Sequence, residues 1–278
     1  MSLAKIIGYI FVGEAIMLGV ATIVFVGSSG LNRIRNTFCE KLQAIVPHLG
    51  LLIIILVVNK VAREYGPDLS WIIGWNITGL IYTIEGDFVG QIQLIATPSL
   101  TTYFSFIYIY GYIFILVFPF IVYFSHPEVY PLKETAIAYA VNYGIGLICY
   151  ILFISYGPRN MIPDIVDPLL YSTYPQSQIL TGEVNANTNV FPSLHTSLSV
   201  SVALLAYKTR EMYLAWTLVA IPTAASIVIA TMYLGIHWGT DVFAGILLGV
   251  VSVFVAERVV FGESRTLRQK IKKYSSYL

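Results

Sequence analysis

Long hydrophobic runs separated by short polar stretches repeat along the whole chain. Seven of them approach the roughly 20 residues that a helix needs to cross the hydrocarbon core of a bilayer. They cover residues 5–28, 45–62, 102–124, 134–155, 190–207, 212–234 and 237–260. The pattern therefore predicts an all-α fold, a polytopic transmembrane helical bundle of six to seven spans.

Two stretches depart from this pattern. The fifth run, 190–207, is short and carries a series of hydroxyl side chains, so we expect it to be buried among other helices. Residues 64–100 are only mildly apolar and contain Trp71 and Trp75. We interpret this segment as interfacial or re-entrant with aromatic anchors, with an eighth span as the alternative. The polar residues 156–190 are expected to form a loop over one end of the bundle.

The composition supports a membrane protein and excludes other classes. With 57% hydrophobic and 11% charged residues, the chain lies outside the range of soluble domains. A net charge of +1 without a basic aromatic patch gives no reason to expect a nucleic-acid partner. Cys39 and Cys149 lie in different segments, and we expect neither a disulfide nor a metal site from them. The first run lacks a small-residue cleavage site and is interpreted as a retained span.

The distribution of basic residues predicts the orientation. If the amino terminus is outside, twelve of the sixteen Lys and Arg residues fall on the cytoplasmic side, and the other side keeps Lys5, Lys60, Arg63 and Arg159. The positive-inside rule favours this arrangement. We therefore expect an integral plasma-membrane protein with a cytoplasmic carboxyl terminus.

Two histidine-containing stretches carry the candidate chemistry. His237 and Asp241 are four residues apart and share one face of a helix, where the carboxylate can orient the imidazole for attack. His195 follows Pro192-Ser193, which is typical of a first helical turn, and helix amino termini bind anions. This combination predicts phosphoryl transfer. In the predicted topology, both stretches and Arg159 fall at the same, extracytoplasmic face.

These stretches resemble two signature motifs of the type 2 phosphatidic acid phosphatase superfamily, Pro-Ser-x-His and Ser-Arg-x5-His-x3-Asp. Pro192, Ser193 and His195 match the first of the two, and His237 and Asp241 match the second at the right spacing. The resemblance implies that the helical core of the superfamily lies in the second half of the chain. We accordingly divide the chain into N-terminal transmembrane helices with an interfacial segment (1–130), a phosphatase-like catalytic core (131–262) and a basic cytoplasmic tail (263–278).

The chain also departs from the family pattern. Ala230-Thr231 replaces the Ser-Arg pair, and the remaining motif, Lys-x6-Arg-Pro, is only echoed by Gly157-Pro158-Arg159, with Leu152 in place of its lysine. This pattern is more similar to the inositol phosphorylceramide synthase-like branch than to the common phosphatases. Candidates to replace the missing positive charge are Asn160, Lys60 and Arg63.

The resemblance implies a role for each matching residue. His237 is the nucleophile that forms a phosphohistidine, Asp241 orients it, and His195 is the general acid and base. The groups that would bind the phosphate are Arg159, Ser193 and Thr231. No cofactor is expected, and no metal, because Asp241 has no cluster of carboxylates around it. Asp164, Asp167 and Glu183 in the loop form a weak alternative cluster.

The predicted function is that of a lipid-phosphate phosphatase with its site on the extracytoplasmic face, and its partners are a membrane lipid phosphate and the bilayer. Two alternatives stay open. The first is a phosphotransferase that moves a phospho-headgroup to a lipid or inositol-type alcohol. The second is a non-catalytic lipid-binding or transport protein. Hydrolysis is preferred to transfer because water is always available as the acceptor.

Overall fold

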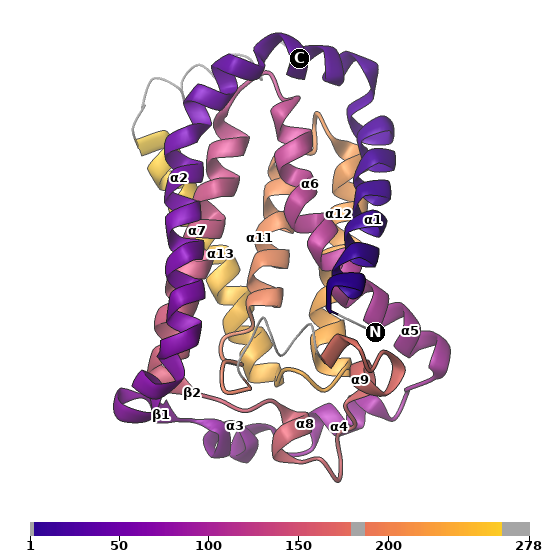
Figure 1. The fold of residues 1–278 in the computed structure, drawn as a ribbon, viewed down its shortest axis with the longest axis vertical. Helices are drawn as coiled ribbons and strands as arrows, with labels where there is room; N and C mark the ends of the chain where they lie inside the picture. Colours follow the sequence, from indigo (N-terminus) through magenta and orange to yellow (C-terminus); the bar gives the residue numbers. More distant parts are fainter. Residues whose placement is uncertain (1–2, 179–186, 263–278) are drawn as a thin grey trace.

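The computed structural model describes residues 3–178 and 187–262, which form a bundle of long helices with short helices across one end (Figure 1). The predicted all-α class is confirmed. The helices of the bundle are α1 (Leu3–Ala21), α2 (Gly27–Ile73), α6 (Tyr112–Phe124), α7 (Tyr130–Leu152), α11 (Leu194–Lys208), α12 (Leu214–Tyr233) and α13 (Gly239–Gly262).

The short elements lie together at the lower end of the bundle in Figure 1. They are β1 (Trp75–Asn76), α3 (Thr78–Glu85), α4 (Phe88–Gln93), α5 (Pro98–Phe106), β2 (Phe153–Ile154), α8 (Pro158–Met161) and α9 (Leu169–Thr173). The strands β1 and β2 pair in parallel. Within the described residues, no helix between 63 and 97 is long and apolar enough to cross a membrane. The eighth span is therefore not found, and the segment crosses the end of the bundle as the interfacial interpretation requires.

Five helical stretches of the described chain have the length and composition of membrane spans: 3–62, 98–124, 130–152, 214–233 and 239–262. The first stretch contains two predicted spans, because α1 and the second half of α2 lie on opposite flanks and are joined across the upper end (Figure 1). The predicted boundary at residue 28 is slightly late. A π-helical turn, η1 (Thr22–Val26), follows α1, and Gly27 with φ 64° separates it from α2.

The central helix α11 is the predicted fifth span. It has 15 residues, about 22 Å at 1.5 Å per residue, and is too short to cross the hydrocarbon core alone. It packs against α6, α7, α12 and α13. Its hydroxyl side chains are fully buried, as predicted: Thr196, Ser197, Ser199 and Ser201. A shorter helix is therefore accommodated because protein, not lipid, surrounds it.

The two ends of the bundle differ in charge. At the upper end, Lys208 forms ion pairs with Glu134 at 3.0 Å and Glu257 at 3.4 Å. Nearby, Lys41 Nζ donates to the Phe124 carbonyl at 2.7 Å, where α6 ends. Cations complete the carboxyl-terminal end of a helix because its last carbonyls lack intrahelical donors. Lys41 and Lys208, two of the basic residues predicted on the cytoplasmic side, thus lie at the end opposite the short helices.

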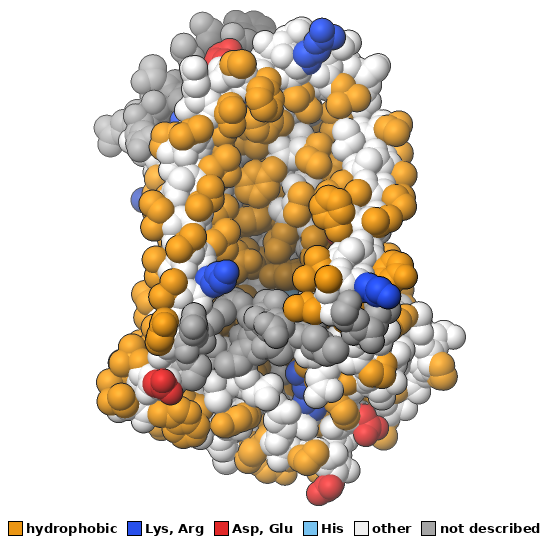
Figure 2. Space-filling view, viewed as in Figure 1, with side chains coloured by type: hydrophobic (Ala, Val, Ile, Leu, Met, Phe, Trp, Pro, Cys, Tyr) orange, Lys and Arg blue, Asp and Glu red, His pale blue; other side chains and the backbone are white. Residues whose placement is uncertain are grey.

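A hollow lined with hydrophobic side chains lies between α1 and α2 on the face shown in Figure 2. A Lys or Arg side chain stands on each side of its lower part in that view. The two helices stand apart because α1 packs on α6 whereas α2 packs mainly on α7. The hollow is therefore open on the flank of the bundle, along the helices.

Candidate active site

Three predicted catalytic residues meet at the lower end of the bundle. His195 lies in the first turn of α11, Asp241 lies in the first turn of α13, and His237 lies in the turn between α12 and α13. The ring centroids of His195 and His237 are 6.4 Å apart. Gly235, with φ 72°, makes the sharp turn, and the Thr231 carbonyl accepts from His237 N at 3.0 Å. Two helix amino termini and one glycine turn thus place the pair.

His237 and Asp241 face one another inside the protein. His237 Nδ1 lies 3.6 Å from Asp241 Oδ2, slightly beyond hydrogen-bond distance, and the side chains are 5% and 0% exposed. Within the described residues, His237 Nδ1 and Asp241 Oδ1 have no hydrogen-bond partner. Buried polar atoms without partners are rare. A small ring movement would bring Nδ1 within hydrogen-bond distance of the carboxylate.

The surroundings of His237 keep its imidazole neutral. The pKa of His237 is lowered from 6.5 to about 3, mainly by burial and next by the Arg159 guanidinium, while a backbone hydrogen bond with Val190 opposes both effects. A neutral imidazole retains the lone pair that a nucleophile needs. At neutral pH the residue is therefore in the form that can attack phosphorus.

His195 lies between two aromatic rings. Its ring centroid is 4.5 Å from that of Tyr108, with the planes 18° apart, and 4.1 Å from that of Tyr112. Tyr108 belongs to η2 (Ile107–Gly111), a π-helical turn before α6, and such turns are frequent at functional sites. The sequence analysis missed both tyrosines. Their spacing of four residues was visible, but nothing in the third hydrophobic run indicated that it faces His195.

Arg159 carries a positive charge that acts on His237. Its guanidinium lies over the Tyr171 ring at 4.4 Å, and Nη2 donates to the Tyr171 hydroxyl at 2.9 Å. Its backbone N–H donates to the Gly235 carbonyl at 3.2 Å, so α8 is tied to the α12–α13 turn. Nη1 is buried and has no partner in the described part of the chain. This nitrogen is available to an anion beside His237.

Ser193 and Thr231 are placed differently by the structure. Ser193 is the N-cap of α11, and its Oγ accepts from Thr196 N at 3.3 Å. The first N–H groups of a helix have no intrahelical acceptor, so this end of α11 can bind an anion. Thr231 Oγ1 donates to the Val228 carbonyl at 2.7 Å. To bind phosphate as predicted, the Thr231 hydroxyl would have to break this hydrogen bond and donate its proton to a phosphate oxygen instead.

The other candidates contribute less. Asn160 and Lys60 are exposed, and the side chain of Arg63 lies outside the described residues. Asp164 and Asp167 are exposed, and Glu183 falls outside the described ranges. Among the residues that the structure describes, no group of three His, Cys, Asp or Glu side chains could hold a metal ion.

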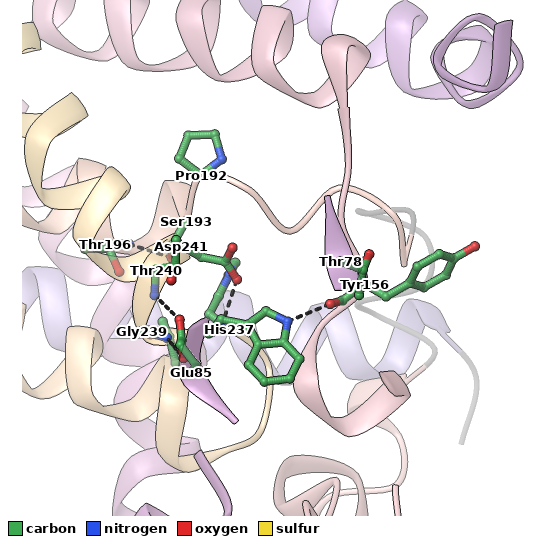
Figure 3. Close-up of polar contacts among 12 residues, drawn as sticks. Thr78, Glu85, Tyr156, Pro192, Ser193, Thr196, His237, Gly239, Thr240 and Asp241 are labelled. Carbon is green, nitrogen blue, oxygen red and sulfur yellow. Dashed lines mark hydrogen bonds and ion pairs between the residues drawn. The ribbon is translucent and has the colours of Figure 1, made fainter. Parts of the chain in front are cut away.

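A residue from the interfacial segment joins the site, and the sequence analysis did not identify it. The Glu85 carboxylate, at the end of α3, accepts from Gly239 N at 2.8 Å and from Thr240 N (Figure 3). These are the first two residues of α13, next to Asp241. The candidate site therefore includes a carboxylate that comes from far upstream in the sequence.

Comparison with known proteins supports the superfamily suggested by the motifs. A family model described as the PAP2 superfamily matches residues 84–255. The match covers more than half of the chain, starts before the predicted core boundary at residue 131, and contains every candidate site residue discussed above except Lys60 and Arg63. Comparisons with curated proteins and with solved structures give no match.

Proposed function

The chain belongs to the PAP2 superfamily, and from this premise we propose that it is an integral-membrane lipid-phosphate phosphatase working through a phosphohistidine. Family membership indicates phosphatase or phosphotransferase activity on lipid phosphates. One observation supports the intermediate most directly: a buried, neutral His237 whose Nδ1 faces Asp241 beside the unpaired Nη1 of Arg159. This arrangement combines a nucleophile, its orienting group and a ligand for the phosphate.

The reaction takes two steps. In the first, His237 Nε2 attacks phosphorus, the N–P bond forms, the P–O ester bond breaks, and His195 gives a proton to the leaving alcohol. In the second, water gives its proton to His195 and attacks phosphorus, the N–P bond breaks, and His237 is restored. Asp241 stabilises the positive charge that the imidazole carries in between. Arg159 and the first turn of α11 stabilise the phosphoryl oxygens in the transition state.

The hydrophobic hollow between α1 and α2 supports a lipid substrate (Figure 2). It is open on the flank of the bundle, and the basic side chains beside it suit an anionic headgroup. Hydrocarbon chains in the hollow would remain in apolar surroundings while the phosphate meets the polar end of the bundle. The excess of basic residues at the opposite end supports a plasma-membrane protein with its site on the extracytoplasmic face.

Phosphotransfer to a lipid or inositol-type alcohol is the second candidate function. Two differences from the phosphatase motifs favour it: Leu152 stands in place of the motif lysine, and Ala230-Thr231 stands in place of Ser-Arg. In both respects the chain resembles the synthase-like branch. The two functions share the first step and differ in the group that attacks the phosphohistidine. A non-catalytic lipid-binding protein would not need the His195, His237 and Asp241 set.

Product analysis distinguishes these functions. Purified protein would be incubated with a panel of lipid phosphates and lipid diphosphates, with and without alcohol acceptors, and the products identified by mass spectrometry. We expect inorganic phosphate, unaffected by EDTA and inhibited by vanadate, which adopts the trigonal-bipyramidal geometry of the transition state. A phosphorylated acceptor in place of phosphate would identify a transferase, and the absence of any product would indicate the non-catalytic alternative. Strong inhibition by EDTA, reversed by one divalent ion, would contradict the metal-free mechanism.

The intermediate can be trapped separately. We expect His195→Ala to accumulate an acid-labile, alkali-stable phosphoprotein with ³²P-labelled p-nitrophenyl phosphate, because this leaving group needs no protonation. His237→Ala should give no label. His48→Ala, on the helix α2 outside the site, is the matched control and should turn over normally. In the His195→Ala background, equal labelling after a second substitution, His237→Ala or His48→Ala, would rule out His237 as the nucleophile.

A further inference from the structure

The amino terminus of α13 is occupied by two carboxylates of the protein itself (Figure 3). Trp238 N donates to Asp241 Oδ2 at 2.8 Å, and the next two N–H groups, of Gly239 and Thr240, donate to the two oxygens of Glu85. Such N–H groups form the positive end of the helix dipole and attract anions. The anion that they attract here is Glu85, so this helix end is satisfied without substrate.

Glu85 is held in place by contacts on both sides of α13. Its own helix, α3, begins at Thr78, whose Oγ1 accepts from Tyr156 N at 3.0 Å, so the segment before it is tied to the chain that leaves β2. On the other side, Trp238 Nε1 donates to the Tyr156 carbonyl at 2.8 Å and the Trp238 ring lies 6.1 Å from Tyr82. A Cβ atom at Gly239 would lie 3.4 Å from Glu85 Oε2. The carboxylate is therefore part of a packed joint between the interfacial segment and α13.

The position of this joint matters for the nucleophile. Asp241 follows directly after the two residues that Glu85 binds, and the charges of Glu85 and Asp241 interact. A shift of the first turn of α13 would move Asp241 relative to His237, across a gap that is already 3.6 Å. Glu85 therefore binds the turn of α13 that carries Asp241, without contacting His237 in the hydrogen bonds of the described residues.

We propose that Glu85 is a positioning residue that holds the first turn of α13 so that Asp241 faces His237, and that it keeps the substrate phosphate away from this helix end. The phosphate is thereby directed to Arg159 and the first turn of α11. This role rests on the proposed phosphohistidine chemistry. Through Glu85, the interfacial segment, which precedes α5 and α6, is joined to the start of α13.

Two measurements on Glu85 variants test the proposal. The first is the single-turnover rate of phosphoenzyme formation per folded protein with ³²P-labelled p-nitrophenyl phosphate. We expect Glu85→Ala to lower it by about tenfold to a hundredfold, as a misplaced reacting group does. Glu85→Gln keeps one accepting oxygen, so its rate of phosphoenzyme formation should lie between those of the wild type and Glu85→Ala. Asp87→Asn, which changes an exposed carboxylate two residues further on, is the matched control and should react at the wild-type rate.

The second measurement is the affinity for inorganic phosphate, by calorimetry in detergent. Glu85→Ala exposes the N–H groups of Gly239 and Thr240, so phosphate should bind about twofold to fivefold more tightly, in proportion to a helix-dipole interaction. A residue that serves folding alone would not produce tighter binding together with a slower reaction. An unchanged rate per folded protein, or an affinity that is unchanged or weaker, overturns the proposal.

The outcome is separable from that of the proposed function. If wild-type protein converts no phosphate ester at all, the proposed function fails, and the calorimetric comparison alone decides about Glu85 because it needs no turnover. If Glu85→Ala does not fold, Glu85→Gln is compared with wild type by the same two measurements, with a smaller expected change in the same directions.

Discussion

At the scale of single residues, the site depends on polar atoms that are buried and still unpaired. His237 Nδ1, Asp241 Oδ1 and Arg159 Nη1 lack partners within the described chain. Leaving a buried polar atom unpaired costs about 1–3 kcal/mol each. A bound phosphoryl group and a small ring movement would satisfy all three. This arrangement is the one that the proposed phosphohistidine reaction requires.

Arg159 provides a direct test of this arrangement. Arg159→Ala should lower kcat/KM about 10²–10³-fold, the usual cost of removing a transition-state donor. Arg159→Lys should recover little, because lysine keeps the charge but not the planar fork that lies over Tyr171. Arg210, whose guanidinium lies over Tyr207 in the same way, is the control, and Arg210→Ala should be fully active. Similar activity of the Arg159 and Arg210 variants would exclude Arg159 from the site.

The depressed pKa of His237 predicts how stability depends on pH. The folded pKa of about 3 lies below the ordinary 6.5, so the unfolded chain binds this proton first as the pH falls. The free energy of unfolding should therefore decrease between pH 6.5 and 3, by about 1.4 kcal/mol per pH unit for each such residue. His126 has a pKa lowered by burial to about 4 and contributes in the same direction.

His237→Gln should make this pH dependence shallower by one proton, whereas a substitution at exposed Glu211 should not change it. The measurement is chemical unfolding in detergent at a series of pH values, followed by tryptophan fluorescence. An unchanged slope in His237→Gln would show that the imidazole is not neutral in the folded protein.

At the scale of helices, the distance between the two histidines depends on how closely α11 and α13 pack. A Cβ atom at Gly249 would lie 2.5 Å from the Ser197 carbonyl, and one at Gly245 would lie 2.6 Å from the Ser193 carbonyl. Both clashes involve backbone, so the helices would have to separate. These two glycines are therefore positions of close helix packing.

Gly249→Ala should destabilise the protein by about 1–3 kcal/mol, the usual cost of overpacking. Gly245→Ala lies one turn from Asp241 and should reduce kcat more strongly, because it moves α13 against the helix that carries His195. Gly144→Ala in α7 is the control, since nothing lies within 4 Å of the added atom. The measurements are thermal unfolding and turnover in detergent, and equal values for the three variants would contradict close packing as the constraint.

At the scale of the whole molecule, the candidate site lies at one end, and three basic residues with structural contacts lie at the other. The candidate site, the short helices and the β1–β2 pair share one end, and Arg33, Lys41 and Lys208 bind at the other (Figure 1). Arg33 and Lys41 bind carbonyl groups near the end of α6, so they serve packing as well as orientation. In a bilayer, the long helices between these two ends would lie in the hydrocarbon core, and the two ends would lie at its opposite surfaces.

Cysteine labelling tests which end faces the outside. In a background without Cys39 and Cys149, a cysteine at exposed Gln176 near α9 should react with an impermeant thiol reagent in intact cells. A cysteine at exposed Glu211, in the turn between α11 and α12, should react only after the membrane is opened. A cysteine at Ser177, which lies beside Gln176 and is only 4% exposed, should react slowly with the reagent from either side of the membrane. The reverse pattern would move the site to the cytoplasmic face without changing its residues.

The sequence by itself determined the helical class, the approximate spans and the histidine pair. A bilayer requires long apolar helices, and the motif spacing keeps His237 and Asp241 close along the chain. The expectation that both share one face of a helix is wrong, because α13 begins at Gly239 and His237 lies in the turn before it. The gathering of His195, His237 and Arg159 at one end also followed from alternating spans. Helix boundaries were less certain, because they depend on single positions such as Gly27, where the backbone changes conformation.

Only the tertiary structure decided which distant residues complete the site. Tyr108 and Tyr112 face His195, and Glu85 binds Gly239 of α13 at a sequence separation of 154, although local periodicity contains no information about such contacts. The same is true of Thr231, whose hydroxyl proton is used within its own helix. Spacing along a helix fixes near neighbours, whereas contacts between elements depend on how side chains pack in three dimensions. For this reason His195, His237 and Asp241 were visible in the sequence, whereas Tyr108, Tyr112 and Glu85 were not.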